Sequence, residues 1–322
     1  MSADNAKTKP GWLPGVGWGW RWSSADEIGA LNFMTRESTL KAIGLVQHGR
    51  AFDLGVSADR SSFHSPAHPS TEILSFRSPE GTKRQADIPF MDPAANTKQL
   101  AFMSALVLCS DHLGSQIDGL AHVTTGNDNH WYNGFTTEKY GGDFGPRRAG
   151  AETTPPIIAR GVMLDVAGLH GVGRLADVTA IGPEDLRAAA TRQKVDLMVG
   201  DVVLVRTGSL MLWGEAGHDH EQLRGADSSG LNLAAARWLV EECGAMVIGS
   251  DTSMVEVFPA VDGDTWHPVH EYLLIEQGVH MAELHYLEEL AAEGISEFCY
   301  VALLPKLRGI TAGFAMRPVA LV

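Results

Sequence analysis

Apolar runs and amphipathic segments alternate through the second half of the chain. Short apolar runs at residues 161–167, 202–208, 246–251 and 298–304 predict buried strands. Helices are predicted between them, from Pro183, over residues 232–243 with Gly244 as the C-cap, and over residues 269–277. Strands that alternate with helices predict a layered α/β fold, although the order of the strands in the sheet cannot be read from the sequence.

The first third of the chain is less regular. A helix is predicted over residues 36–48, ended by Gly49, and a short strand at residues 52–55. Residues 57–100 are polar and rich in proline, which predicts a long excursion or hairpin that covers a site. The apolar run Ala101–Cys109 predicts another buried strand. Several tryptophans among the first 22 residues predict an arm, about residues 1–25, that packs across a surface.

Composition and charge narrow the class of protein. The chain has 322 residues, 44% of them hydrophobic and 20% charged, as in an ordinary globular protein. Its net charge of −14 argues against nucleic acid or an anionic membrane as a partner, since both favour a basic surface. We read no signal peptide and no membrane-spanning run, and three widely spaced cysteines fit reduced thiols, so we expect a cytoplasmic protein.

The candidate chemistry lies between His112 and His122. Polar residues that can bind a metal stand at even positions of this segment, so on an extended backbone they share one face, while the opposite face is apolar. A straight strand would spread them over about 30 Å, too far for one ion. Gly114 and Gly119 allow the backbone to bend and bring the side chains together. The polar set is His112, Gln116, Asp118 and His122.

Imidazole and carboxylate ligands together suit Zn²⁺ or Mn²⁺, and a glutamine oxygen is a weaker, harder ligand. The spacing alone leaves a second interpretation open, in which this segment is a polar turn with hydrogen-bonded histidines. An aromatic segment follows His122, and its residues Trp131, Tyr132 and Asn133 are candidates for a substrate-binding loop. Packing of these side chains, as surface aromatics, on a neighbouring subunit is the equally open alternative.

The same segment resembles the signature His-x-Gly-Thr-His-x-Asp-x-Pro-x-His of the putative cyclase superfamily, which includes bacterial kynurenine formamidases and isatin hydrolase. It stands here as His112-x-Gly-Ser-Gln116-x-Asp118-x-Leu120-x-His122. Further stretches similar to the family follow in order at residues 26–32, 161–166, 200–208, 248–252, 267–274 and 317–321. The resemblance covers nearly the whole chain. It implies a single domain over residues 1–322 with a swivelling β/β/α-type fold, in which helices flank a curled mixed sheet.

The resemblance also implies roles for individual residues. His112 and Asp118 become metal ligands, and His122 becomes the general acid/base. The family's later His and Glu fall on His270, a further ligand, and on Glu283, which either binds the metal or orients water. The chain departs from the family pattern at Gln116, where a histidine ligand is usual, and at Leu120, where proline is common. Because Gln116 is the weaker ligand, we expect one bound Mn²⁺ or Zn²⁺ rather than two.

The activity implied by the resemblance is metal-assisted hydrolysis of an amide, lactam or ester carbonyl in a small cyclic or aromatic substrate. Family members are typically homo-oligomers, so a dimer or tetramer is expected. A lyase or dehydratase that uses the same metal is one alternative. A non-catalytic relative that binds a small ligand is another, with Gln116 as the mark of a decayed site.

Overall fold

The computed structural model describes residues 22–85, 92–214, 220, 223 and 228–322. Most of the predicted N-terminal tryptophan arm therefore lies outside the described residues. Its last member, Trp22, packs edge-on against Phe33, with ring centroids 5.0 Å apart.

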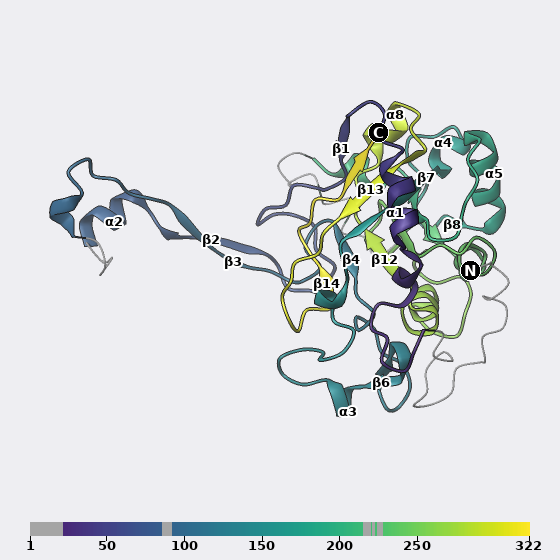
Figure 1. Cartoon of the computed structure of the whole chain (residues 1–322), viewed down its shortest axis with the longest axis horizontal. Coiled ribbons are helices and arrows are strands. Elements are labelled where there is room, and N and C mark those ends of the chain that lie inside the picture. The colour runs from purple at the N-terminus through teal and green to yellow at the C-terminus, as the bar shows by residue number, and fades with distance from the viewer. Residues whose placement is uncertain (1–21, 86–91, 215–219, 221–222, 224–227) are drawn as a thin grey trace.

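A nine-stranded mixed sheet forms the centre of the molecule and curls strongly (Figure 1). Four parallel strands in its middle are flanked by antiparallel strands on both sides. At one edge of the sheet, β1 pairs with β15, so a strand from the first quarter of the chain lies beside the last strand. In order across the sheet, the strands are β1 (Ala51–Asp53), β15 (Val319–Leu321), β13 (Glu297–Ala302), β7 (Ile157–Asp165), β9 (Val202–Arg206), β11 (Val247–Ser250), β12 (His280–Glu283), β4 (Gln116–Asp118) and β14 (Ala312–Gly313).

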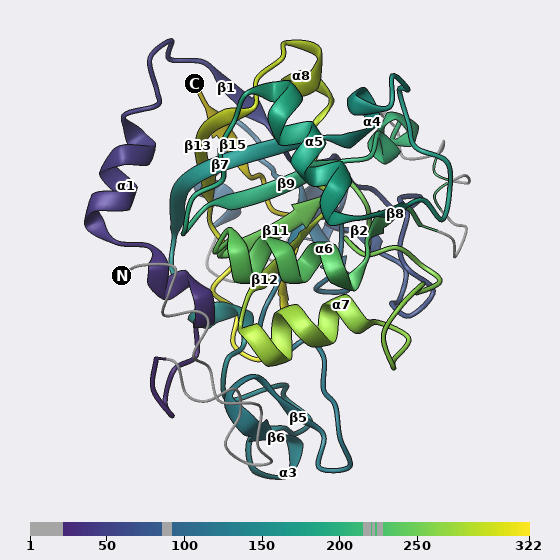
Figure 2. The same ribbon diagram turned by 90° about the vertical axis from the view of Figure 1, so that its right-hand side faces the viewer.

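Helices flank this sheet, as Figure 2 shows for α5, α6 and α7. Helix α5 (Pro183–Gln193) begins with proline in its first turn, and α6 (Leu233–Arg237) continues as a π-helical segment, Trp238–Glu242. Helix α7 (Pro268–His270) likewise continues through Glu271–Gln277. The predicted curled mixed sheet flanked by helices is confirmed. Smaller elements are α1 (Arg36–Ile43), α3 (Thr137–Tyr140), α4 (Val166–Leu169), α8 (Glu288–Ala292), and the two-residue strands β5 (His130–Trp131), β6 (Phe135–Thr136), β8 (Ala180–Ile181) and β10 (Gly230–Leu231).

The predicted ends of a helix agree with the structure where capping residues determine them. Asn232 caps α6 by accepting a hydrogen bond from the Ala235 amide, and Gly244 ends the segment with a φ of +73°. The helix predicted over residues 36–48 is shorter, because α1 ends at Ile43 and Gly44 is its C-cap.

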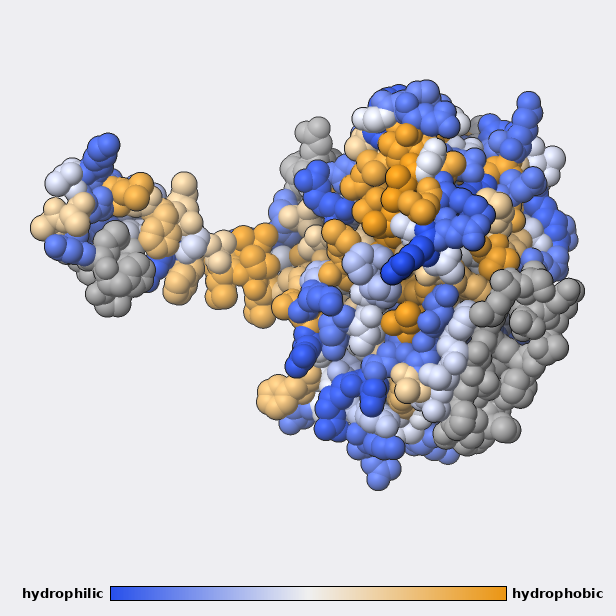
Figure 3. Space-filling view, in the orientation of Figure 1, coloured by the Kyte–Doolittle hydropathy of each residue, from blue (hydrophilic) through white to orange (hydrophobic). Residues whose placement is uncertain are grey.

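One predicted strand has the wrong environment. The run Ala101–Cys109 does contain a strand, β3 (Ser104–Leu108), but it pairs only with β2 (Glu72–Arg77) in a hairpin that leaves the body of the molecule (Figure 1). Leu106, Val107 and Leu108 are each more than half exposed. The prediction of a buried strand is therefore wrong for the part of the chain that the structure describes, because no second layer of those residues covers the hairpin, whose stem shows apolar colouring in Figure 3. Helix α2 (Pro79–Gln85) lies beyond β2.

Among the described residues, no helix is both long and apolar enough to cross a membrane.

Candidate metal centre

Strand β4 carries the signature segment into the sheet between β12 and β14. Gly114, which precedes it, has a φ of +63°, a conformation that glycine adopts without strain. After the strand, a Cβ atom on Gly119 would lie 2.8 Å from the Thr311 carbonyl oxygen, so only glycine allows this close approach. The backbone therefore turns at both glycines. Leu113, Ile117 and Ala121 are buried in the core, and the predicted apolar face is confirmed.

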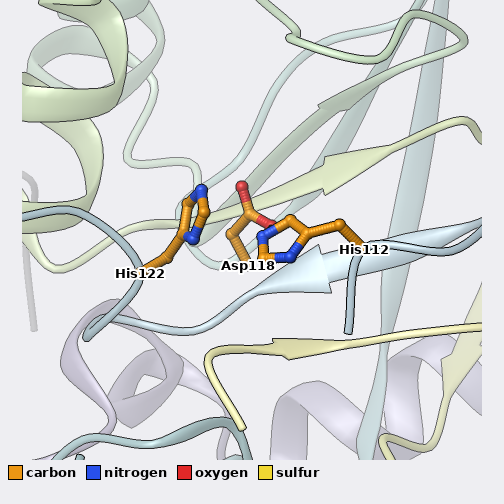
Figure 4. A group of neighbouring side chains, drawn as sticks. All are labelled: His112, Asp118 and His122. Atoms are coloured by element: carbon orange, nitrogen blue, oxygen red, sulfur yellow. The ribbon is translucent and has the colours of Figure 1, made fainter. Parts of the chain in front are cut away.

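His112, Asp118 and His122 form one cluster of potential ligands (Figure 4). One donor atom from each lies within 4.8 Å of the others. The Nε2 atom of His112 is 3.5 Å from Asp118 Oδ1, and the rings of His112 and His122 are 4.2 Å apart. The bend of the chain thus brings the two ends of the signature to the carboxylate in its middle.

A second cluster shares Asp118 and adds His270 and Glu283. His270 Nε2 lies 4.0 Å from Asp118 Oδ2 and 3.7 Å from Glu283 Oε1. Helix α7 supplies the histidine, and β12, the neighbour of β4, supplies the glutamate. Residues predicted from distant parts of the sequence therefore meet at one carboxylate.

Gln116 lies beside the second cluster, and its amide nitrogen contacts the Glu283 carboxylate. The Gln116 Nε2 atom donates a hydrogen bond of 2.6 Å to Glu283 Oε2, and the side chain is buried. The amide oxygen, Oε1, is buried without a hydrogen-bond partner among the described residues. That oxygen is the atom through which a glutamine can bind a metal.

The donor set fits a divalent cation. Buried atoms without a hydrogen-bond partner in the described part of the chain gather here: His112 Nε2, Gln116 Oε1, and both carboxylate oxygens of Asp118. Such orphaned groups are costly unless an ion or water binds them. Burial and the neighbouring Glu283 carboxylate raise the pKa of Asp118. A cation between the two carboxylates would relieve this repulsion.

Asp111 holds His112 in place. Its Oδ1 atom is 2.9 Å from His112 Nδ1, and its Oδ2 atom accepts from the Thr311 amide and hydroxyl. Burial works against ionisation, but these hydrogen bonds lower the pKa of Asp111. A carboxylate on the far nitrogen turns the other ring nitrogen toward a metal, as in many histidine sites. The sequence analysis missed this residue, although its place directly before His112 was a usable signal.

Glu256 does the same for His270. Its Oε1 atom receives a short hydrogen bond from His270 Nδ1 and lies 3.1 Å from His267 Nδ1. The Val269 amide donates to Oε2 of the same carboxylate. Burial opposes ionisation here too, yet the two imidazoles lower the pKa of Glu256 to about 2. Glu256 precedes His267 by eleven residues and His270 by fourteen, a spacing that matches no motif in the sequence. Both contacts therefore depend on the fold.

Among the three histidines of the two ligand clusters, His122 is the one with no carboxylate hydrogen bond to its ring in the described part of the chain. Burial, followed by the neighbouring His112, His270 and His68, lowers its pKa well below the usual value. A neutral imidazole beside the ligand cluster can accept a proton. His68, from the polar segment before β2, stacks on His112 with ring centroids 4.2 Å apart. The sequence analysis missed it, because nothing near His68 resembles a motif.

A cavity of about 400 Å³ opens beside His270. Trp266, which is 74% exposed, stands at this cavity next to His267, with their rings 4.2 Å apart. The chain just after His122 forms another part of the wall. The lining residues are Val123, Thr124, Thr125, Asp264, Thr265, Trp266, His267, His270, Glu271 and Ile275.

The aromatic segment after β4 has a different environment. Trp131, Tyr132 and Asn133 are all buried. The indole donates to the Arg148 carbonyl, the tyrosine hydroxyl to Asp26, and the asparagine amide to the carbonyls of Ser23 and Asp26. All these contacts lie within the chain, so the three side chains are not surface aromatics, and none of them lines the cavity beside His270. Their role in binding substrate stays a prediction.

Asp251 also has a structural role. Its carboxylate accepts hydrogen bonds from the Thr207 amide and hydroxyl and from the Gly208 amide. It therefore caps the turn after β9 and does not contact a candidate ligand imidazole.

A sequence comparison identifies the family. A sequence model described as "Putative cyclase" matches residues 52–257, well over half of the chain. The chain belongs to this family. No curated protein sequence matches it.

Solved structures share the whole fold. A crystal structure described as a novel cyclase aligns with a TM-score of 0.80 at 23% identity, covering 98% of this chain and 99% of that chain. Isatin hydrolase A from Ralstonia solanacearum aligns with a TM-score of 0.62 at 18% identity, covering 90% and 98%. An isatin hydrolase bound to the product analogue thioisatinate aligns with a TM-score of 0.58 at 15% identity, covering 90% and 99%. The cyclase-family chain thus has the fold of the isatin hydrolases.

Proposed function

We propose that this chain is a metal-dependent hydrolase that cleaves an amide, lactam or ester carbonyl in a small cyclic or aromatic substrate. The observation that carries the proposal is the set of buried, unpartnered donor atoms around Asp118. His112, Asp118, His270 and Glu283 would hold a divalent ion, with the Gln116 oxygen as an additional donor. A bound divalent ion supplies two kinds of chemistry, a lowered pKa of water and polarisation of a carbonyl.

His122 would move the proton. The ring lies beside His112, and its lowered pKa keeps it neutral, so it can take a proton from the attacking water. The same nitrogen would then return the proton to the leaving nitrogen or oxygen of the substrate. Asp111 and Glu256 orient the rings of His112 and His270, which keeps the donor nitrogens directed at the site.

The cavity beside His270 would hold the body of the substrate. Trp266 offers an exposed aromatic side chain to a flat ring, and Thr124 and Thr125 add polar side chains to the cavity lining. A volume of about 400 Å³ suits a small molecule. A structure of the same fold is an isatin hydrolase bound to the product analogue thioisatinate, which supports a small cyclic or aromatic substrate.

The test combines metal analysis with a substrate screen. Protein purified without chelators is loaded in turn with Mn²⁺ and Zn²⁺, then assayed against aromatic lactams, N-acyl anilines and aryl esters by the acid that hydrolysis releases. We expect metal-dependent acid release that chelator abolishes and added metal restores. A product that retains all substrate atoms except water would instead indicate a dehydratase. Stoichiometric metal binding with no turnover of any carbonyl class would indicate a non-catalytic relative.

A further inference from the structure

One histidine at the cavity beside His270 has no place in the two ligand clusters around Asp118. His267 lines this cavity, and its side chain is 17% exposed. It lies directly before Pro268, the first residue of α7, and its carbonyl accepts a hydrogen bond from the Glu271 amide. A proline at the next position restricts the backbone of His267. The ring is therefore presented to the cavity from a fixed point at the start of a helix.

Three neighbouring rings pack around the His267 imidazole. Its centroid lies 4.2 Å from that of Trp266, 5.2 Å from that of Phe258 and 4.9 Å from that of His270. Close packing of this kind leaves a side chain little freedom to change its rotamer. The edge of the ring, rather than its position, therefore decides what it can bind.

Glu256 determines which nitrogen of His267 carries the proton. The Glu256 carboxylate lies at both imidazoles through Oε1, and the Val269 amide donates to Oε2. A carboxylate can only accept hydrogen bonds, so His267 Nδ1, which is 3.1 Å from Oε1, must be the donor. In a neutral imidazole the other nitrogen then has no hydrogen and accepts. The contact with Glu256 thus makes His267 Nε2 an acceptor.

The Nε2 atom of His267 is open to a ligand. It makes no hydrogen bond within the described part of the chain, and it does not belong to the buried polar atoms. Glu256, which Nδ1 faces, is itself buried. The exposed part of the ring is therefore the opposite edge, which carries Nε2, and this edge meets the cavity.

The rest of the cavity lining also offers more acceptors than donors. Asp264 and Glu271 contribute carboxylates, and the described lining residues include no lysine, arginine, asparagine or glutamine. The remaining donors are the Trp266 indole and the hydroxyls of three threonines, which can also accept. A ligand that brings its own N–H groups therefore satisfies this lining better than one that brings only acceptors.

We propose that His267 is a substrate-binding residue, whose Nε2 atom accepts a hydrogen bond from an N–H group of the substrate while Glu256 holds the ring in the accepting tautomer. The inference deepens the proposed function and rests on it for the reacting carbonyl, which the metal would bind beside His270. It favours amides and lactams with a free N–H over esters, because an ester has no hydrogen for the Nε2 lone pair. Glu256 would then position a metal ligand and a substrate-binding ring together.

The test compares ligands of nearly the same shape on the metal-loaded protein. Aminobenzoates and methylbenzoates are acids of the kind that hydrolysis releases, and only the amino group can donate a hydrogen bond. The ortho, meta and para pairs are titrated by calorimetry. We expect the amino member of at least one pair to bind about 3–10-fold more tightly, the effect of one net hydrogen bond. A preference in no pair, or no binding of any of these acids, overturns the proposal.

Variants at matched metal content separate this role from a structural one. His267→Asn keeps an N–H close to the place of Nδ1 but has no atom at the place of Nε2, so the preference should disappear. Should this variant fail to fold or lose its metal, His267→Phe, which keeps a ring against Trp266, takes its place. Thr265→Val removes a hydroxyl from the same lining and is the matched control. A preference that persists without His267, or that is lost in the control, overturns the proposal.

This readout does not depend on turnover, so it is separable from the proposed hydrolysis. A chain that shows the preference but hydrolyses no carbonyl compound would keep His267 as a ligand-binding residue and lose the hydrolase function. A chain that hydrolyses its substrates but binds both members of every pair equally would keep the function and overturn the role of His267.

Discussion

Gln116 and Glu283 face each other across the ladder between β4 and β12, and the glutamine amide donates a 2.6 Å hydrogen bond to the glutamate. The residue at which this chain departs from its family is thus bonded to a residue of the second ligand cluster. The bond fixes one oxygen of Glu283, while the other faces His270 at 3.7 Å. Because the amide nitrogen makes this bond, the glutamine oxygen is the atom left without a hydrogen-bond partner among the described residues.

Removing a ligand should remove the metal. We expect His112→Ala and Asp118→Ala each to lose bound metal, because each removes a donor that lies in the shared cluster. The Asp118 variant should lose more, since Asp118 belongs to both clusters. Elemental analysis of the purified proteins measures the metal content. His170→Ala, at a partly exposed histidine outside the clusters, is the control and should keep its metal. Full occupancy in both test variants would disprove the assignment.

His122 should matter for turnover more than for metal binding. We expect His122→Ala to retain the metal and to lower kcat by roughly 10²–10⁴, the usual contribution of a general acid/base. The geometry also allows His122 to bind the ion, because its ring lies in the cluster with His112 and Asp118. Metal content and kcat are therefore measured on the same sample. Loss of the metal together with activity would make His122 a ligand instead of the proton carrier.

The sequence predicted the centre of the site better than its surroundings. The alternation of polar and apolar positions around Asp118, with glycines on both sides, indicated which side chains share a face and where the backbone bends, and the resemblance added His270 and Glu283. Glu256 and His68 were missed because their contacts arise from the packing of segments far apart in the sequence. The pattern of Trp131 and its neighbours could equally mean packing or binding, and it carries no information that separates the two.

The β2–β3 hairpin shows a second reason why a sequence pattern can predict the wrong environment for a strand. An apolar run such as Ala101–Cys109 predicts that a strand will be buried, but it does not say which surface buries it. Within this chain Leu106 and Leu108 are exposed, so the prediction failed for the isolated fold.

Glu256 should act as a positioning residue. We expect Glu256→Gln to weaken metal affinity by about 10–100-fold, because a neutral amide cannot hold the His270 and His267 rings as a carboxylate does. Titration of the apo protein with Zn²⁺ measures the affinity. Glu241→Gln removes a carboxylate that accepts from Tyr272, on the helix that follows α7, and is the matched control. Equal affinities in the two variants would assign Glu256 to folding alone.

His280 should make stability depend on pH. Burial lowers its pKa in the folded protein to about 3, whereas the unfolded chain has a value near 6.5. Below pH 6.5 the unfolded state binds a proton that the folded state does not, so this residue reduces stability as the pH falls. At pH 5 the loss is about 2 kcal/mol. Denaturant unfolding of wild type and His280→Leu at pH 7 and pH 5 measures it. The variant should lose correspondingly less between the two values, and an identical loss would contradict the prediction.

We expect Gln116 to influence how many ions this site holds and which ion it prefers. A neutral amide oxygen binds a metal less tightly than an imidazole nitrogen and favours a harder ion. The wild type should therefore favour Mn²⁺ over Zn²⁺ more strongly than family members with a histidine at this position. Gln116→His restores the family ligand and removes the hydrogen bond to Glu283. We expect it to raise affinity for Zn²⁺ and to admit a second ion that Asp118 shares between the two clusters.

Titrations of apo wild type and Gln116→His with Mn²⁺ and with Zn²⁺, side by side, give both the number of ions and the preference. Gln116→Leu is the control, since it removes the hydrogen bond to Glu283 without adding a ligand. If freeing Glu283 alone were the cause, the leucine variant would show the same gain as the histidine variant. If neither variant changes the number of ions or the Zn²⁺ affinity, Gln116 does not contact the metal. In that case its amide serves only to hold Glu283, and the expectation of a single ion fails because it rested on Gln116 being a weak ligand.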